Sequence, residues 1–455
     1  MRARAAGRGQ TALPGDQEKR LSTSQSLYER ASRHVPGGVH SNTRFQAPHP
    51  VYFHRAEGAY LWDVEGDRYL DCTMGNASVM LGHACPDVDA AVADAVSRGL
   101  TTGVETEAAV TAVELLSGMI PDFGRVRFAN TGTEALMHAL RIARHHTGRE
   151  RVAKAEGAYH GWFDPLWVSN WPAPDQVGPA DRPAAPPSSA GLSRSAQGTV
   201  VLPFNDAAAT ERLLREHASD LAAVVVEPVL IDIGYIPATG EYLRLLRDLT
   251  AELGIVLIFD ELLTGFRLAP GGARQVYGIT PDLTTYGKAI SNGYPLAAVE
   301  GRADLLAATD PSSGGPVGWV GTYNGHGSAV AAAAATLPLL ADGSAQARLD
   351  RLGGLVRDGF AELSRAYGIP AVVAGAGGHF QPYFLSEPVT GYRTAMVSDA
   401  ARYAILHRVA REHRILLPAK PLLHAALSTA HTEADVAVLL KAAEEAFAEM
   451  RRRTT

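Results

Sequence analysis

Lys288 is the residue of this sequence best placed to do chemistry. It lies in the stretch TPDLTTYGKAISNGYPLAA, residues 280–298, between a polar entry and a Gly-Tyr-Pro turn, so its amine stands on loop-like backbone. A lysine amine can condense with an aldehyde to a Schiff base and act as a nucleophile. The alternative is a plain surface lysine, because most lysines are exposed. Three other segments favour the chemical interpretation.

The first of these segments, ANTGTEA at residues 129–135, predicts an anion site at the start of a helix. Thr131, Gly132 and Thr133 follow a strand-like run and precede a helical pattern. A helix N-terminus offers unpaired N–H groups and a positive dipole end, and glycine lets the backbone approach a phosphate closely. Thr131 with Glu134 three residues later also fits a capping box, and the same turn can do both.

Two carboxylates end two apolar runs that are typical of buried parallel strands. Asp260 follows the run 255–259, and Glu227 follows the run 223–226. Ligands in open α/β sheets gather at the carboxyl ends of the strands, so Glu227 and Asp260 should face one crevice. A buried Asp260 needs a partner such as a protonated ring nitrogen or an arginine, with a helix N-cap as the alternative role.

The third segment is EGAYHG at residues 156–161, in which Tyr159 is placed to stack on a flat ring. Simple packing is the alternative for a single tyrosine. Taken together, a phosphate-binding turn, a stacking aromatic, a strand-end aspartate and a loop lysine fit one ligand. That ligand is pyridoxal 5'-phosphate (PLP), which combines a phosphate, a ring, a basic nitrogen and an aldehyde.

The patterns around these residues predict an α/β protein with a mostly parallel central sheet and helices on both faces. From about Pro86, helical patterns alternate with short apolar runs, which is typical of βαβ units. We expect a flexible tail, an N-terminal segment, a large PLP-binding domain and a smaller α+β domain at residues 1–20, 21–85, 86–335 and 336–455. The Pro-, Ala- and Ser-rich span 171–197 is most simply a long surface loop.

Composition favours a cytoplasmic enzyme. The net charge of -6 gives no general attraction to nucleic acid or anionic membranes. No run reaches the roughly 18 apolar residues of a membrane span, and the N-terminus lacks an apolar signal region. Cys72 and Cys85, without metal-ligand spacing, fit a reducing compartment and predict no metal site.

The sequence resembles the class III aminotransferases of the fold type I PLP-dependent enzymes, most closely the glutamate-1-semialdehyde 2,1-aminomutase branch. The resemblance covers nearly the whole chain after the tail and is carried by RVRFANTGTEA, GAYHGW, EPV, IVLIFDELLTGFR and PDLTTYGKAISNGYP. It implies the fold type I transferase architecture, PLP as cofactor, and Lys288 as the internal aldimine lysine and proton shuttle.

The resemblance also implies roles for other residues. Asp260 would keep the pyridine nitrogen protonated, and Tyr159 and Leu262 would cover the two ring faces. Thr322 of a neighbouring subunit would complete the phosphate site, which implies a homodimer with shared active sites. The full set of implied cofactor contacts is Thr131, Gly132, Thr133, Tyr159, Glu227, Asp232, Asp260, Leu262, Lys288 and Thr322.

The substrate side departs from the aminomutase pattern. Arg44 matches an arginine that faces the substrate carboxylate in the aminomutases, where a guanidinium can grip both oxygens. However, Asp232 stands where they carry asparagine, Asn76 where they carry tryptophan, and Leu423 where they carry glutamate. Arg44 and Asn76 are therefore candidate substrate contacts in an altered pocket.

We expect a PLP-dependent aminotransferase that moves an amino group between an amino acid or amine donor and a small-molecule carbonyl acceptor. The alternative is an isomerase with the same cofactor, either a semialdehyde aminomutase or an amino acid racemase. PLP-dependent bond formation in a specialised pathway is a further alternative that Asp232 keeps open. Intact Lys288 and Asp260 argue against a non-catalytic protein of this fold.

Overall fold

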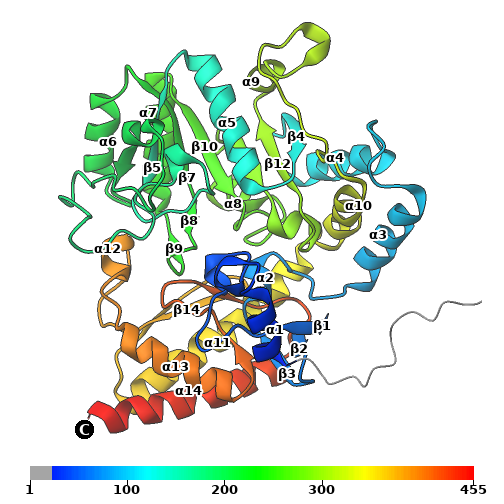
Figure 1. Cartoon of the computed structure of the whole chain (residues 1–455). Helices are drawn as coiled ribbons and strands as arrows, with labels where there is room; N and C mark the ends of the chain where they lie inside the picture. Colours follow the sequence, from blue (N-terminus) through cyan, green and yellow to red (C-terminus); the bar gives the residue numbers. More distant parts are fainter. Residues whose placement is uncertain (1–22, 455) are drawn as a thin grey trace, which may run out of the picture. The chain divides into compact units, whose positions relative to one another are not determined.

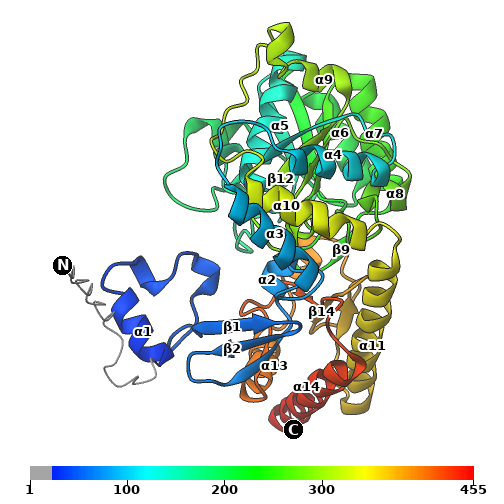
Figure 2. The same cartoon turned by 90° about the vertical axis from the view of Figure 1, so that its right-hand side faces the viewer.

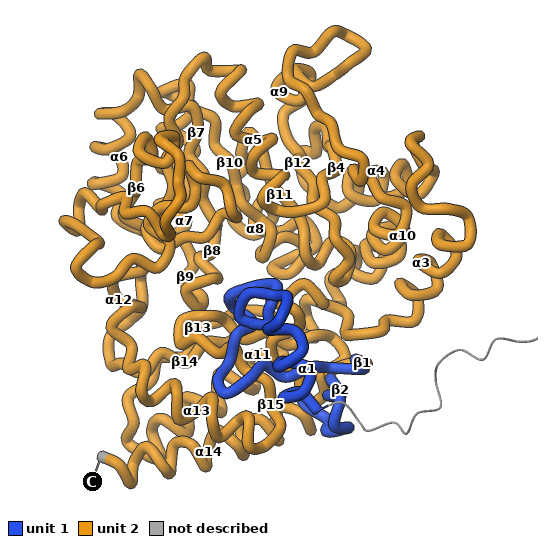
Figure 3. Tube along the Cα trace, in the orientation of Figure 1, with its two compact units in different colours: residues 1–56, 61–69 blue, residues 57–60, 70–455 orange. Residues whose placement is uncertain are grey.

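The computed structural model describes residues 23–454, so the tail predicted at residues 1–20 lies outside the described residues. Contacts divide the chain into two units (Figure 3). Unit 1 comprises Met1–Ala56 and Leu61–Tyr69, and unit 2 comprises Glu57–Tyr60 and Leu70–Thr455.

Unit 1 begins with a capped helix. The Thr23 hydroxyl accepts a hydrogen bond from the Ser26 N–H, and the Ser26 hydroxyl accepts one from the Thr23 N–H, which is a capping box for α1. Glu65 accepts hydrogen bonds from the backbone and hydroxyl of Ser24, so the helix is tied to the following strands. The elements that lie wholly or partly in this unit are α1 (Ser24–Ala31), β1 (Phe53–Glu57), β2 (Tyr60–Asp63) and β3 (Arg68–Asp71).

Unit 2 is built on a seven-stranded sheet with the order β4-β12-β11-β10-β7-β5-β6. The strands from β6 to β11 in this order are parallel, and only β12 runs antiparallel to its two neighbours, β11 and β4. The predicted mostly parallel sheet is therefore confirmed. The strands are β4 (Arg125–Ala129), β5 (Arg151–Ala155), β6 (Val200–Leu202), β7 (Leu221–Val226), β10 (Val256–Glu261), β11 (Leu283–Tyr286) and β12 (Ala297–Gly301).

Helices cover both faces of this sheet (Figure 1). Side chains alternate along a strand, so Ile258 packs with α5 on one face while Leu257 packs with α6 and α7 on the other. Every residue of β7 and β10 is buried, as expected for parallel strands covered twice. The helices of this region are α2 (Met74–Ala77), α3 (Pro86–Arg98), α4 (Glu107–Met119), α5 (Gly132–Thr147), α6 (Ala207–Glu216), α7 (Gly240–Leu253), α8 (Gly272–Tyr277), α9 (Ala303–Ala307) and α10 (Gly327–Thr336).

The C-terminal part of unit 2 combines helices with a small antiparallel sheet, β13-β14-β16. Helices α11 and α14 pack against each other (Figure 2), and their apolar faces join one core cluster with α10. Both predicted domains lie within unit 2, so the boundary at residue 335 stays a prediction. The remaining elements are the hairpin β8 (Val229–Leu230) and β9 (Ile236–Pro237), then α11 (Ser344–Tyr367), β13 (Val372–Ala374), β14 (His379–Tyr383), α12 (Tyr392–Ala395), α13 (Ala400–Glu412), β15 (Ile415–Leu416), β16 (Ala425–Ala426) and α14 (Glu433–Thr454).

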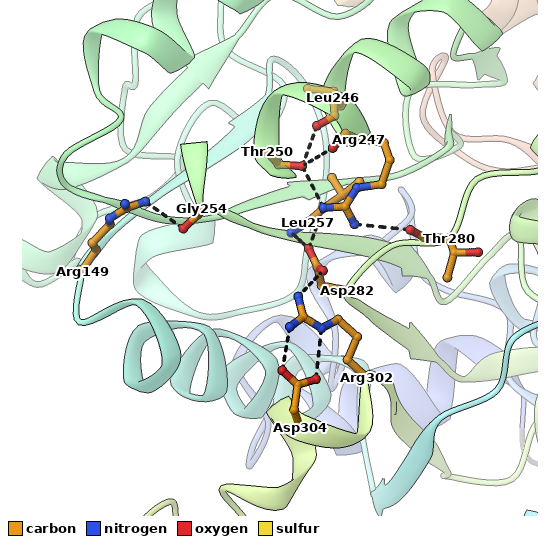
Figure 4. Close-up of polar contacts among 10 residues, drawn as sticks. All are labelled: Arg149, Leu246, Arg247, Thr250, Gly254, Leu257, Thr280, Asp282, Arg302 and Asp304. Carbon is orange, nitrogen blue, oxygen red and sulfur yellow. Dashed lines mark hydrogen bonds and ion pairs between the residues drawn. The ribbon is translucent and has the colours of Figure 1, made fainter. Parts of the chain in front are cut away.

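Asp282 ties together the elements at the amino ends of the central strands (Figure 4). Its carboxylate accepts hydrogen bonds from the Leu257 N–H at 2.8 Å, from Arg247 at 3.0 Å and from Arg302 at 2.9 Å. Arg302 also pairs with Asp304, which is exposed, whereas Asp282 is buried. The network connects α7, β10 and the start of α9 at the amino ends of the strands, opposite the carboxyl ends where the site residues lie.

We expect Asp282→Ala to lower the free energy of unfolding by roughly 3 kcal/mol, because it leaves a buried N–H and a half-buried guanidinium without their acceptor. The matched control is Asp304→Ala, which removes an exposed partner of the same arginine and should cost less than about 1 kcal/mol. Urea unfolding of both variants measures the difference. Equal losses would show that Asp282 acts only as a surface charge.

Candidate active site

Nine of the predicted site residues line one cavity of about 270 Å³. The cavity lies at the carboxyl ends of β7 and β10, where the sequence predicted a common crevice for two carboxylates. These nine residues are Thr131, Gly132, Thr133, Tyr159, Glu227, Asp232, Asp260, Leu262 and Lys288.

The turn between β4 and α5 forms one end of the cavity. Thr131 is the N-cap of α5, and its hydroxyl accepts the Glu134 N–H at 3.2 Å. The Glu134 carboxylate reaches back to the Asn130 N–H at 2.8 Å. The hydroxyl of Thr133 accepts the Trp162 N–H at 3.1 Å. The first N–H groups of a helix have no intrahelical acceptor, so this turn presents an anion-binding helix end to the cavity, while Thr131 also caps the helix.

Glycines make room for Leu262 beside this turn. A Cβ at Gly132 would lie 2.4 Å from a Leu262 methyl carbon, and a Cβ at Gly287 would lie 2.6 Å from the other. Leu262 is therefore wedged between the helix start and the residue before Lys288. Only glycine at both positions lets this side chain form a wall of the cavity.

Asp260 is held in place by His160, which the sequence argument did not identify. The Asp260 carboxylate lies 2.8 Å from Nδ1 of His160 and accepts the Thr285 hydroxyl at 3.3 Å. Burial lowers the pKa of His160, opposed by its hydrogen bond to Asp260, so the neutral ring donates its Nδ1–H to the Asp260 carboxyl group. The signal was present in the motif, because His160 directly follows Tyr159 and a buried aspartate needs a partner.

Two further carboxyl groups, Glu227 and Asp232, share the cavity with Asp260. Burial raises the pKa of Glu227 well above its usual value, and the charges of Asp232 and Asp260 raise it further. Burial also raises the pKa of Asp232, and Lys288 opposes that shift. Glu227 accepts long hydrogen bonds from the N–H groups of Tyr159 and Ile231, at 3.4 and 3.3 Å. Three carboxyls facing a single lysine favour a protonated Glu227.

Two tryptophan rings pack against Tyr159. Its ring stacks on Trp171, with centroids 5.7 Å apart and planes at 18°, and meets the edge of Trp167 at 5.8 Å. Trp171 begins the span that the sequence predicted as a surface loop, and its indole N–H donates to the Asp232 carbonyl at 2.9 Å. Burial raises the pKa of Tyr159 to about 12, so the phenol stays neutral. One end of the loop therefore supports the cavity wall.

Lys288 begins a short 3-10 helix, Lys288–Ser291, directly after β11. Its φ of 48° lies in the left-handed region, which side-chain-bearing residues rarely adopt and which is frequent at functional sites. The side chain is half-buried and lines the cavity together with Gly287. Lys288 therefore lines the same cavity as Asp232 and Asp260.

Lys154 is a second buried lysine, on β5, and it organises the segment that carries Tyr159 and His160. Its ammonium donates to the carbonyls of Ala158 at 2.6 Å, Leu166 at 3.1 Å and Val168 at 2.8 Å, and it also contacts the Asn170 side chain. Burial lowers its pKa to about 7, opposed by the charge of Glu227. Lys154 does not line the cavity, so we assign it a positioning role.

We expect Lys154→Met to lower the free energy of unfolding by roughly 3 kcal/mol at pH 7, because buried carbonyls lose their donor. Between pH 7 and 10.5 the unfolded chain binds the Lys154 proton and the folded chain does not, so this lysine adds stability as the pH rises. The difference between the wild type and the variant should therefore grow by up to about 1.4 kcal/mol per pH unit. Urea unfolding at pH 7 and 9 tests this, and a shrinking difference would contradict it.

Three predicted contacts lie outside the lining of this cavity. Asn76 is exposed in α2 with a φ of 54°, two residues before Ser78, which does line the cavity. Thr322 is exposed in the turn before α10. Arg44 is exposed and belongs to unit 1. Their roles as substrate or cofactor contacts stay predictions.

Within residues 23–454 no group of three or more His, Cys, Asp or Glu side chains is arranged to hold a metal ion. In the same range no single helix is long and apolar enough to cross a membrane. The pair Gly327–Leu339 and Ser344–Tyr367, bent by 76°, passes that test only when both are taken together, on length and composition.

Comparison with known proteins decides the family. The family model described as "Aminotransferase class-III" matches residues 42–389, which is most of the chain. The chain belongs to the class-III aminotransferase family. Among curated relatives, glutamate-1-semialdehyde 2,1-aminomutase of Persephonella marina is 36% identical over 95% of this chain and 100% of its own length. The enzyme of the same name from Thermomicrobium roseum is 39% identical, over 95% and 99%.

Solved structures of this family confirm the fold type I architecture. An omega-transaminase from Sphaerobacter thermophilus superposes with a TM-score of 0.90 at 35% identity, covering 95% of this chain and 99% of that one. A structure described as a transaminase with PLP bound gives 0.86 at 32% identity, covering 94% and 98%. The cofactor of this class-III enzyme is pyridoxal 5'-phosphate, as the sequence predicted.

The residues of the cavity fit this cofactor. The Thr131–Thr133 turn would hold the phosphate. Its glycine lets the backbone approach an anion closely, and the N-terminus of the helix provides unpaired N–H groups. Asp260, held by His160, would accept a hydrogen bond from the protonated ring nitrogen. Lys288 would supply the amine that binds the aldehyde, and Tyr159 and Leu262 would flank the ring.

Proposed function

We propose that this protein is an aminotransferase that moves an amino group between an amino acid or amine donor and a carbonyl acceptor. The observation that carries the proposal is a cavity lined by nine of the ten expected cofactor contacts, all but Thr322, in a chain whose substrate side departs from the aminomutase pattern. Asp232 lines that cavity where the aminomutases have asparagine, and Asn76 and Leu423 replace their tryptophan and glutamate. The similarity to an omega-transaminase over nearly the whole chain supports it.

Each side chain has a definite task in this reaction. Bound PLP supplies an aldehyde that accepts amines and a ring that withdraws electrons from the substrate carbon. Lys288 would move the substrate proton, because it is the one lysine among the residues that line the cavity. Asp260 keeps the ring nitrogen protonated, and His160 holds the Asp260 carboxylate in place.

Single-turnover amination tests the proposal. The purified holoenzyme is mixed with a panel of amino acids and amines without a keto acid, and conversion of the cofactor to its aminated form is followed by absorbance and chromatography. At least one donor should convert the cofactor stoichiometrically, and adding a keto acid should reverse the change. If no donor converts the cofactor to its aminated form, the proposal is wrong.

A glutamate-1-semialdehyde aminomutase is the second candidate, because relatives of that name match at 36% and 39% identity over almost their entire length. An aminomutase rearranges a single substrate and needs no second carbonyl compound. Incubation with glutamate-1-semialdehyde alone distinguishes the two. Rapid formation of the rearranged isomer, with no amination by other donors, would favour the aminomutase.

We also propose a cytoplasmic homodimer in which Thr322 completes the partner's phosphate site. Thr322 stands between two exposed apolar side chains, Val320 and Tyr323, which a partner subunit would cover. Sedimentation of the wild type and of Val320→Asp tests the dimer. A wild type that is monomeric at working concentrations would overturn it.

A further inference from the structure

Arg393 on α12, orange in Figure 1, binds the residue that follows β5 and a loop, both of which are far from it in sequence. Its Nε and Nη2 atoms donate to the two carboxylate oxygens of Glu156, both at 2.9 Å, in the bidentate geometry of strong arginine–carboxylate pairs. The Glu156 side chain is 5% exposed and that of Arg393 28%, so solvent screens the pair only partly. Arg393 also donates to the carbonyls of Gly178, Val177 and Pro179, at 2.9, 2.8 and 3.0 Å.

Tyr392, the residue before Arg393, contacts the same two segments. Its hydroxyl donates to the Pro172 carbonyl at 2.7 Å. Its buried ring covers the backbone at Gly157, where an added Cβ would lie 2.6 Å from the ring carbons. Gly157 also has a φ of 79°, so both its conformation and the close ring require glycine. We call Tyr392 and Arg393 the α12 clamp, because together they connect the segment after β5 to the loop.

The two segments held by the α12 clamp carry aromatic rings at the wall of the reaction cavity. Tyr159 lines the cavity and lies three residues after Glu156. Trp171 directly precedes Pro172 and stacks on Tyr159 with planes at 18°. The Trp171 indole N–H donates to the carbonyl of Asp232, which also lines the cavity. The clamp therefore contacts the chain within three residues of each member of the stacked pair.

The backbone at Trp171 has a conformation that side chains disfavour. Trp171 has a φ of 49° and Ser169 a φ of 52°, both in the left-handed region. A bulky residue persists in this region only where the surrounding contacts determine its conformation. These contacts include the Tyr392 bond to Pro172 and a hydrogen bond from the Gly157 N–H to the Ser169 carbonyl at 2.9 Å. The position of the Trp171 ring thus depends on the segments that the α12 clamp connects.

We propose that Arg393 and Tyr392 are positioning residues for the aromatic wall that faces PLP. Neither is among the residues that line the cavity, so they act through Tyr159 and Trp171. Loss of the clamp lets Trp171 relax, and the Tyr159 ring is then less fixed. The inference rests on the placement of Tyr159 beside the PLP ring and not on the proposed amino transfer.

Circular dichroism of bound PLP in the holoenzyme tests the clamp without turnover. PLP has no chiral centre, so its dichroic band arises from fixed, asymmetric surroundings and reports how well the wall is ordered. We expect Arg393→Met to weaken the band per bound PLP and to speed PLP loss during dialysis by about tenfold, as when a residue that orients a ligand contact is removed. Arg393→Lys, which cannot form the bidentate pair, should give a smaller change in the same direction. Each variant is measured at a temperature where its far-UV spectrum matches the wild type.

Arg182→Met is the matched control. Arg182 lies on the same loop and forms its own bidentate pair with Glu216, but both side chains are exposed and the pair joins the loop to α6. This variant should leave the dichroic band and the rate of PLP loss unchanged. An effect equal to that of Arg393→Met would show that any anchor of the loop is sufficient, and would overturn the inference.

Tyr392→Phe keeps the test decisive if Arg393→Met does not fold. It removes only the hydroxyl bond to Pro172 and leaves the ring in place over Gly157, and it should weaken the band by less than Arg393→Met. Tyr159→Leu removes the ring itself and should weaken the band most.

Three results would overturn the inference or the proposed function separately. The inference is wrong if folded Arg393→Met and Tyr392→Phe both keep the wild-type band and PLP retention. It is also wrong if Tyr159→Leu leaves the band unchanged, because Tyr159 then does not face the PLP ring. Weakened bands in a holoenzyme that no donor aminates would support the α12 clamp and refute the proposed function instead.

Discussion

Replacing Lys288 by alanine is expected to abolish amination of the cofactor by every donor that the wild type accepts. In the proposed reaction, the Lys288 side chain both binds the cofactor covalently and moves the substrate proton. General acid–base transfer alone contributes about 10²- to 10⁴-fold, so kcat should fall by at least that factor. Lys288 is the only lysine among the residues that line the cavity. The measurement is single-turnover amination of the PLP-loaded variant.

The internal rival for this role is Lys154, whose buried amine has a pKa lowered to about 7 and is therefore partly neutral at physiological pH. Its nitrogen is occupied by three carbonyls, which leaves it poorly available as a nucleophile. Borohydride reduction of the holoenzyme followed by peptide mapping separates the two, and the label should fall on Lys288. Lys441→Ala, an exposed lysine on α14, is the matched control and should retain wild-type rates. A label on Lys154 would contradict the assignment.

The strand-end carboxylates show what local sequence can predict. Glu227 and Asp260 end continuous apolar runs, and the topology of a parallel sheet sends such ends to one edge. The Thr131–Thr133 turn was predictable for the same reason, since a cap followed by an amphipathic pattern fixes where a helix begins. Nine of the predicted contacts line one cavity, although Asp232 and Leu262 among them were implied by the family resemblance and not by the local sequence.

The partners of these residues were not predictable, because contacts between side chains on different strands produce no periodic pattern in the sequence. His160 and Asp260 are 100 positions apart and meet only because β5 and β10 both flank β7. Lys154 ends a strand-like run, where a solvated charge is the ordinary interpretation. Trp171 opened a stretch without apolar period, yet its ring supports Tyr159. Each case depends on a long-range contact rather than on composition.

Asp260→Asn is expected to lower kcat/KM by about 10²- to 10³-fold, the usual cost of removing one preorganised electrostatic group. The amide has nearly the shape of the carboxylate but carries no charge to keep the ring nitrogen protonated. Its oxygen can still accept from His160 Nδ1, now 2.8 Å from the carboxylate, so the fold and cofactor binding should persist. Steady-state kinetics with the best donor, together with cofactor content by absorbance, measure both quantities.

His160→Ala separates the charge of Asp260 from its orientation. The imidazole does not line the cavity, so its loss should reduce kcat about tenfold, less than Asp260→Asn does, because Asp260 remains and keeps its Thr285 partner but is less fixed. Asp232→Asn, which places the aminomutase asparagine in the cavity, keeps both members of the pair and should cost less still. If Asp260→Asn lowered kcat/KM no more than Asp232→Asn did, a group other than Asp260 would have to keep the ring nitrogen protonated. The ranking of the three variants therefore tests whether Asp260 acts on the cofactor directly while His160 only positions Asp260.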